Sequence, residues 1–264
     1  MAMNDALLLG AITIVSFTLA FYGAAVGLIL GHLRLPLLNC YLPSAGAASA
    51  TNLAISGLGA LTGTIRHARD GRISLRVIAI MGIPSVVGAV IAGFVLVKVE
   101  PHWARIFVGG FLAVSGINLV FSRPEEGGTV LFGRGLRMAL EILIGLALGF
   151  LAVVTGLMMG SMRLPMMIKW LRIDPRVAVG SNMAVGCLTA LAGVVTLWTQ
   201  GGTFALTPLL IIAPPTILGG WLGAKWTGKF RKESLALMVG WTVAVTGLLM
   251  VGEGVWRSAA EWFV

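Results

Sequence analysis

Residues 27–36 read GLILGHLRLP, and residues 156–165 read GLMMGSMRLP. Six of the ten positions are identical. Farther along the chain single residues recur at nearly the same spacing, among them Asn52 with Asn182 and Pro84 with Pro214. The repeat predicts two related halves of four hydrophobic segments each. Paired halves are common in secondary transporters.

The composition excludes a water-soluble fold. Hydrophobic residues make up 58% of the chain and charged residues 11%, whereas soluble proteins carry about 25% charged residues. Disorder is excluded as well, because it requires low hydrophobicity. The net charge of +9 does not indicate nucleic-acid binding, since Lys and Arg punctuate apolar runs. In a membrane protein such a surplus marks the cytoplasmic side.

Apolar runs long enough to cross a bilayer cover most of the chain. A helix needs about 20 apolar residues for this, and lipid offers no partner to unpaired backbone groups. The sequence predicts eight helical segments: 6–31, 48–65, 75–97, 103–122, 138–160, 177–198, 205–226 and 234–252. The halves are residues 1–122 and 138–264, and residues 123–137 form a predicted cytoplasmic linker. No Lys or Arg precedes Arg34, so we expect no cleaved signal peptide.

Equivalent loops of the two halves carry opposite charge bias. The loop 66–76 is rich in arginine, but its counterpart 199–204 is uncharged. The loop 98–105 is nearly balanced, but its counterpart 225–233 is basic. By the positive-inside rule the halves are inverted, with both termini outside and the basic loops in the cytoplasm.

Inversion requires an odd number of crossings in each half, so one segment in each half must turn back. We expect segments one and five to be re-entrant or broken hairpins that turn at the GLxxG sequence. A short return helix is expected to start near Pro36 and Pro165, because proline suits a first helical turn. Non-helical backbone at membrane depth must be buried in protein or line a cavity. Eight full crossings remain the alternative.

Arg34 and Arg163 are the strongest functional candidates. An arginine within the membrane usually faces a cavity or a partner. A helix N-terminus beside it adds N–H donors and partial positive charge, which suits an oxyanion. Two such sites are expected to meet near the midplane. The alternative is that both arginines reach an interface or bond a carbonyl group.

Other residues of the repeat complete the predicted anion site. Asn52 and Asn182, each preceded by a hydroxyl residue, can bind an oxyanion or hold helices together. Glycines can allow a tight turn or a close approach to a ligand, or simply pack helices. The predicted substrate-binding residues are Arg34, Arg163, Asn52, Asn182, Gly31, Gly160, Thr51, Ser181, Pro36 and Pro165.

His32 and Glu141 are the titratable candidates for proton coupling. A histidine has an ordinary pKa of about 6.5, but His32 has Ser161 at its repeat position, and Glu141 is expected beside Arg137. No Ser-His-Asp set, HExxH or GxxxxGK motif is present, and Cys40 and Cys187 lie in no metal-binding pattern. The sequence therefore predicts no enzyme, cofactor or metal.

At the repeated motif the chain resembles the sulfite exporter TauE/SafE family of membrane transporters. That family shows GxGGGxxxxPxL near the start of each half, and Gly27, Gly31 and Pro36 fit this frame, as do Gly156, Gly160 and Pro165. The family's Thr-Ser element corresponds to Thr51-Asn52 and Ser181-Asn182. Here the middle glycines are replaced by Ile29-Leu30 and Met158-Met159. The resemblance implies transport of sulfite, sulfonates or related anions across a bacterial inner membrane.

The sequence as a whole predicts an all-α polytopic membrane protein. Its expected function is secondary transport of a small anion by alternating access around a midplane site. The alternatives are a passive anion channel and a non-transporting assembly partner. The expected partners are the anionic substrate and the lipid bilayer, and a homodimer is left open.

Overall fold

The computed structural model describes residues 2–94, 101–121, 133–155 and 157–262, and none of these residues forms a β-strand. The expected all-α class is therefore confirmed. The helices are α1 (Ala2–Val26), α2 (Gly31–Tyr41), α3 (Ala45–Arg69), α4 (Leu75–Val77), the π-helix η1 (Ile78–Gly82), α5 (Ile83–Phe94), α6 (Pro101–Phe121), α7 (Arg134–Thr155), α8 (Gly160–Lys169), α9 (Pro175–Thr199), α10 (Leu206–Thr227) and α11 (Lys232–Trp262).

Six of the described helical stretches are long and apolar enough to cross a membrane, which supports a multi-pass membrane protein. They are Ala6–Val26, Leu75–Phe94, Gly135–Thr155, Pro175–Thr199, Leu206–Thr227 and Lys232–Trp256. Helix α3 is as long as α9 but carries more Ser and Gly, and it packs against both α9 and α10.

All eight predicted segments have a helix, but several boundaries differ. The first ends at Val26 and the fifth at Thr155, five residues early, while the last helix continues to Trp262. Helix α7 begins at Arg134, so the last residues of the predicted linker are helical, and Arg137 among them pairs with Glu141. The division into two halves and a linker stays a prediction. Predicted segment residues 95–97 and 122 and linker residues 123–132 lie outside the described residues.

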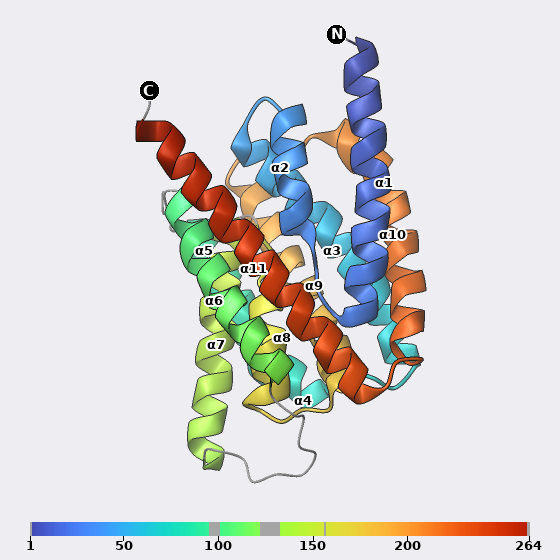
Figure 1. Ribbon diagram of the computed structural model, residues 1–264, viewed down its shortest axis with the longest axis vertical. Coiled ribbons are helices and arrows are strands. Elements are labelled where there is room, and N and C mark those ends of the chain that lie inside the picture. Colours follow the sequence, from blue (N-terminus) through green and yellow to red (C-terminus); the bar gives the residue numbers. More distant parts are fainter. Residues whose placement is uncertain (1, 95–100, 122–132, 156, 263–264) are drawn as a thin grey trace.

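A broken helical hairpin begins each half, as predicted. Helix α1 ends at Val26, Gly27 adopts a φ of 76°, and α2 runs back toward the N-terminal end of the molecule (Figure 1). Helices α7 and α8 form the second hairpin, of which Gly156 lies outside the described residues. Residues 28–30 and 157–159, which link the helices, are buried. Their non-helical backbone is therefore shielded by protein, as lipid requires.

The expected position of the prolines is wrong. Helices α2 and α8 start at Gly31 and Gly160, so Pro36 and Pro165 are the sixth residues and not in the first turn. The start is set by the repeated glycines, which allow close packing at the helix ends, as described below. Each proline leaves one carbonyl of the helix without its usual i→i−4 partner.

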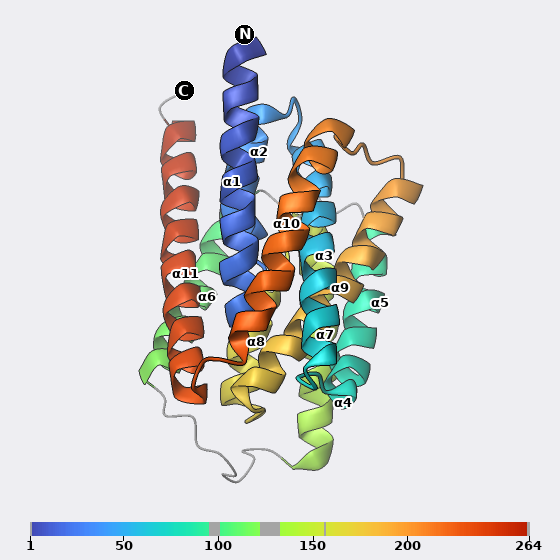
Figure 2. The ribbon, with the colours of Figure 1, turned by 90° about the vertical axis from the view of Figure 1, so that its right-hand side faces the viewer.

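The main helix pairs join one half to the other. Helix α1 packs against α10, α7 against α5, α3 against α9, and α6 against α11, and Figure 2 shows α1 beside α10. Glycine permits this closeness: a Cβ on Gly223 would lie 1.9 Å from the Phe21 carbonyl oxygen, and one on Gly149 would lie 1.9 Å from that of Ser85. The pairs follow the repeat. When each helix is replaced by its counterpart in the other half, the pair α1–α10 becomes α7–α5, and the pairs α3–α9 and α6–α11 stay the same. The inversion of the halves stays a prediction.

The basic loops gather at one end of the molecule. Figure 1 places both termini at one end, and places α4 and the α10–α11 connection at the other. The arginines of residues 66–76 and the lysines of 225–233 therefore share an end. This grouping agrees with the predicted arrangement, although the cytoplasmic assignment stays a prediction.

Candidate functional site

The two repeated arginines are buried in the bundle. The exposed fraction is 3% for Arg34 on α2 and 1% for Arg163 on α8. Each is the fourth residue of its helix, one turn after the glycine that starts it. This burial argues against the alternative in which the side chains reach a membrane interface.

Arg34 is held by one face of α3. Its Nε donates to Asn52 Oδ1 at 3.0 Å, and its Nη2 donates to Ser56 Oγ at 2.7 Å. The same Nη2 also lies 3.2 Å from the Asn52 carbonyl oxygen. Asn52 and Ser56 are one helical turn apart, so a single face of α3 fixes the guanidinium plane.

Arg163 has an equivalent asparagine but a different hydroxyl partner. Its Nη1 donates to Asn182 Oδ1 at 3.3 Å, and its Nη2 donates to Ser85 Oγ at 3.2 Å. Ser85 lies on α5, in the other half, and also shares a hydrogen bond of 2.8 Å with Thr189. The Nε of Arg163 is buried, and none of the described residues forms a hydrogen bond with it.

Asn182 ties the two hairpins together. Its Nδ2 donates to the carbonyl oxygen of Gly27 at 2.8 Å and to that of Gly160 at 3.0 Å. One amide therefore bridges the turn of the first hairpin and the start of α8. Both asparagines orient their arginine through Oδ1, which fits the helix-holding interpretation. Direct contact between either asparagine and a substrate stays a prediction.

Gly31 and Gly160 allow α2 and α8 to approach these asparagines. A Cβ on Gly31 would lie 2.3 Å from Ser56 Oγ, and one on Gly160 would lie 2.9 Å from Asn182 Nδ2. Both helices begin without a side-chain cap. Their first N–H groups therefore add partial positive charge beside each arginine.

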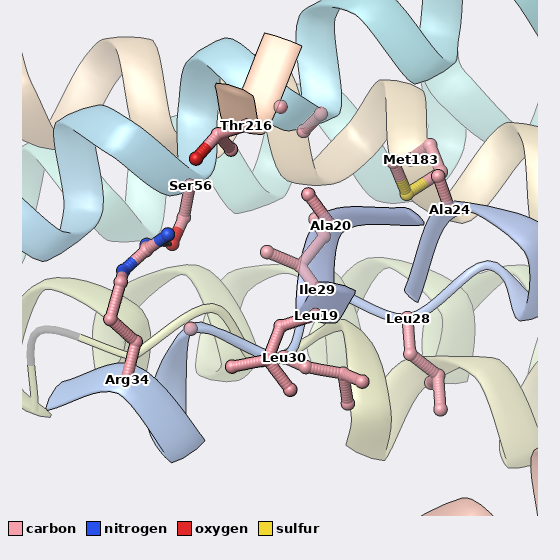
Figure 3. Close-up of a pocket in the computed structure, with 13 residues that line it drawn as sticks. Leu19, Ala20, Ala24, Leu28, Ile29, Leu30, Arg34, Ser56, Met183 and Thr216 are labelled. Carbon is pink, nitrogen blue, oxygen red and sulfur yellow. Dashed lines mark hydrogen bonds between the residues drawn. The ribbon is translucent and has the colours of Figure 1, made fainter. Parts of the chain in front are cut away.

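A pocket opens beside Arg34 (Figure 3). The guanidinium group points at Ser56, with Thr216 of α10 beyond it, while Ile29 and Leu30 form part of an apolar wall. Water can reach about 30 Å³ of this pocket. Arg163 is not among its lining residues, so within the described chain the two guanidinium groups serve separate polar clusters.

Thr51 and Ser181 lie in equivalent contacts away from the guanidinium groups. The backbone N–H of Ala205 donates to Thr51 Oγ1 at 3.0 Å, and that of Ser74 donates to Ser181 Oγ at 2.9 Å. Ala205 and Ser74 directly precede α10 and α4. Each hydroxyl therefore satisfies a backbone donor at the start of a helix from the other half.

The two titratable candidates have different surroundings. His32 is buried, its Nε2 has no hydrogen-bond partner among the residues that the structure describes, and it lines an open groove between α2 and α11. Glu141 is held by Arg137 at 2.9 Å and by Arg76 at 3.2 Å. This double ion pair neutralises the carboxylate. Among the residues that the structure describes, no three His, Cys, Asp or Glu side chains group as metal ligands.

Sequence reasoning missed the hydroxyl groups of the two clusters. Ser56 follows Asn52 by one turn, so helical spacing could have revealed it. Ser85 and Thr216 come from other segments and carry no such signal. Ser85 follows Pro84 and η1, a π-helix that changes which side chains of this segment face the bundle.

Comparison with known proteins agrees with this architecture. The model of the family described as sulfite exporter TauE/SafE matches residues 11–250. The chain belongs to this family. The expectation drawn from the repeated motif is therefore confirmed, although the middle glycines of the family pattern are absent here.

Two curated relatives share this similarity. The "Probable membrane transporter protein MJ0441" of Methanocaldococcus jannaschii is 26% identical over 260 residues, which cover 93% of this chain and 96% of the relative. The "Probable membrane transporter protein YunE" of Bacillus subtilis is 27% identical over 114 residues, which cover 43% of this chain and 41% of the relative. No solved structure matches the chain significantly.

Proposed function

We propose that this protein is a secondary transporter of a small anion: sulfite, an organosulfonate or a related sulfur oxyanion. It works by alternating access in a bacterial inner membrane. Family membership and the names of the two relatives support transport. The proposal assigns no catalytic reaction to the chain.

The observation that carries the proposal is the buried Arg34 beside a pocket. Its guanidinium group and the uncapped start of α2 offer donors to one small space, which the side chains of Ser56 and Thr216 also line. The Thr216 hydroxyl already donates to the Ile212 carbonyl oxygen at 2.8 Å, so it adds an acceptor to this space. Charge-assisted hydrogen bonds to an oxyanion are about twice as strong as neutral ones. Arginine's fixed planar fork matches the geometry of a sulfonate or sulfite group.

In this conformation the pocket is too small to hold a sulfite or sulfonate anion. A volume of about 30 Å³ accommodates roughly one water molecule. Helices α1, α3, α9 and α10 all contribute to its lining. We therefore expect the anion to bind when these helices separate, and Arg163 to take the equivalent role when the second hairpin opens.

His32 is the better candidate for a coupling proton. It lies two residues before Arg34, so the two side chains leave α2 on nearly opposite faces. A proton on His32 and an anion at Arg34 would then share one short helix. The ion pairs of Glu141 favour a structural role for that residue.

Binding and counterflow test the proposal together. Sulfite, sulfate, thiosulfate and small sulfonates are added to the purified protein, and the thermal unfolding midpoint is measured. A specific ligand at one hundred times its Kd stabilises the folded state by about 2.7 kcal/mol. Vesicles loaded with that anion should then show saturable uptake and counterflow of the labelled anion.

Two outcomes would contradict the proposal. Flux that neither saturates nor shows counterflow would favour a passive anion channel. The absence of any stabilising anion would favour a non-transporting assembly partner.

A further inference from the structure

The basic end of the molecule carries cations stacked on tryptophans. The guanidinium carbons of Arg69 and Arg66 on α3 lie 5.0 Å and 5.7 Å from the ring centre of Trp221 on α10. Farther along the chain, Lys229 Nζ lies 4.4 Å from the ring centre of Trp226. We call these five residues the Trp221 cluster.

The positive charge of this cluster is only partly neutralised. Asp70 pairs with Arg66 at 3.1 Å and also with Arg72. Arg72 in turn donates to the Ala224 carbonyl oxygen at 2.8 Å, which ties it to α10. None of the ion pairs within the described chain includes Arg69 or Lys229. Two exposed cations therefore remain without an acidic partner.

Exposed apolar stripes on two neighbouring helices lead to these cations. On α3, Leu61 and Ile65 precede Arg69 at intervals of four residues, and both are exposed. On α10, Leu218 and Leu222 precede Trp226 at the same interval, and they are exposed too. Residues four apart share one face of a helix, and α3 packs against α10.

We infer that the Trp221 cluster binds the headgroup of an anionic phospholipid, whose acyl chains lie along the two apolar stripes. The phosphodiester would accept hydrogen bonds from Arg69 and Arg66, because guanidinium groups bind phosphate oxygens in pairs. Tryptophan is typical of the membrane interface at headgroup level. The arrangement of an apolar stripe followed by stacked cations matches an amphipathic anion such as phosphatidylglycerol.

The location suggests a consequence for transport, which rests on the proposed function. Helix α3 contributes Ser56 and α10 contributes Thr216 to the pocket beside Arg34. A lipid held by Arg69 of α3 and Trp221 of α10 would keep these helices together at the basic end. It would thereby favour the conformation in which this pocket is narrow.

The experiment measures lipid binding to the full-length protein in neutral detergent by native mass spectrometry. Phosphatidylglycerol and phosphatidylcholine are titrated separately, and we expect clear preference for the anionic lipid. Each Lys or Arg near a membrane surface contributes roughly fivefold in affinity for anionic lipid. Arg69→Gln should therefore weaken phosphatidylglycerol binding about fivefold, and Arg66→Gln with Arg69→Gln more strongly.

Two further variants keep the test specific. Arg231→Gln removes one charge at the same end, from an exposed arginine outside the cluster that lies near Glu233, and should change binding less than twofold. Trp221→Leu keeps every charge and should weaken binding about twofold to fivefold through loss of the cation–π contacts. Elution volume and thermal midpoint report the folding of each variant. Should Arg69→Gln fail to fold, Arg69→Lys, which keeps the charge but not the fork, should show an intermediate loss.

Three outcomes would overturn the inference. Equal losses in Arg69→Gln and Arg231→Gln would mean diffuse attraction without a site. Equal binding of phosphatidylglycerol and phosphatidylcholine would mean that the negative charge of the lipid does not contribute to binding. Displacement of the lipid by millimolar glycerol phosphate would indicate a site for a soluble phosphate. None of these readouts depends on transport, so failure here leaves the anion-transport proposal standing.

Discussion

The Arg34 and Arg163 clusters begin from almost the same ten residues but have different surroundings. Arg34 takes its hydroxyl partner, Ser56, from the α3 of its own half. The repeat counterpart of Ser56 is Gly186, whose space is filled by the side chains of Ile29 and Met158. Arg163 instead takes Ser85 from α5 of the other half. A repeated motif can therefore place two arginines alike and still give them unlike partners.

This difference leaves a pocket beside Arg34, and Arg163 is not among the residues that line it. The first hairpin thus has both a charge and adjoining space, whereas the second has a charge bonded to Asn182 and Ser85. The proposed anion site is therefore placed at Arg34 in this conformation. It gives Arg163 a larger share in holding α8 against α5 and α9.

Replacing each arginine by alanine gives the sharpest test of this difference. Truncating one member of a buried, hydrogen-bonded charge interaction costs about 2 kcal/mol or more, which is roughly 30-fold in affinity. We expect Arg34→Ala to lose this much anion affinity and nearly all counterflow. Arg163→Ala should lower the thermal midpoint, because Ser85 and Asn182 lose a partner, with a smaller loss of affinity.

Equal loss of affinity in both variants would break the comparison and favour one site shared by both arginines. Arg34→Lys is the matched control, since it keeps the charge but not the planar fork. This variant should still bind the anion measurably, but more weakly than the wild type.

The glycines that start α2 and α8 test whether close packing maintains the clusters. Gly31→Ala would place a Cβ 2.3 Å from Ser56 Oγ, and Gly160→Ala one 2.9 Å from Asn182 Nδ2. Overpacking costs about 1–3 kcal/mol, and the shorter contact should cost more. The measurement is the thermal midpoint, and Ser56→Ala should partly rescue Gly31→Ala. No rescue would mean that the strain lies elsewhere.

The two serine partners separate binding from stability. Ser56→Ala removes a hydroxyl that lines the pocket and should lower anion affinity by about tenfold or more, since a hydrogen bond to a charge contributes about 1.5–3 kcal/mol. Ser85→Ala should leave affinity within about twofold and destabilise the fold by about 1 kcal/mol. Ligand-induced thermal shifts report both quantities. If Ser85→Ala lowered the anion affinity and Ser56→Ala lowered only the stability, the binding site would lie at Arg163.

The helix caps that follow the hairpins are expected to show the smallest effect. Ser44 Oγ accepts from the N–H of Ala47 at the start of α3, and Asp174 Oδ1 accepts from that of Arg176 at the start of α9. Burial alone would raise the pKa of Asp174, but the hydrogen bonds and charge of Lys232 and the backbone N–H groups lower it overall. Either residue changed to alanine should cost about 1 kcal/mol.

Only the Asp174 cap should depend on pH. Its folded-state pKa lies below the unfolded value of about 3.9, so its contribution is present above that pH and is lost as the pH falls through the folded-state pKa. The difference in thermal midpoint between wild type and Asp174→Asn should therefore shrink below about pH 4, and that for Ser44→Ala should stay constant. If the difference in thermal midpoint stayed constant with pH for both variants, the ionised carboxylate of Asp174 would not contribute to the cap.

The fold was largely predictable because lipid permits so few structures. Uncharged runs must be helical, and the GLxxG sequences marked the two breaks, at Gly27 and before Gly160. The proline prediction failed because helix starts were set by close packing of Gly31 against Asn52 and Ser56. The pairing of Glu141 with Arg137 was predictable because the two residues lie four apart, but the second partner, Arg76, comes from the other half.

For the site, the residues that carry charge into the bundle, and their occurrence as a pair, could be found without a structure. Repetition, apolar context and the cost of a buried guanidinium group are local properties, and they pointed to Arg34, Arg163, Asn52 and Asn182. The partners Ser56 and Ser85, and the pocket beside Arg34, became visible in the folded protein. Those features depend on how helices from different halves pack, and side chains distant in sequence share a cluster only once the packing has formed.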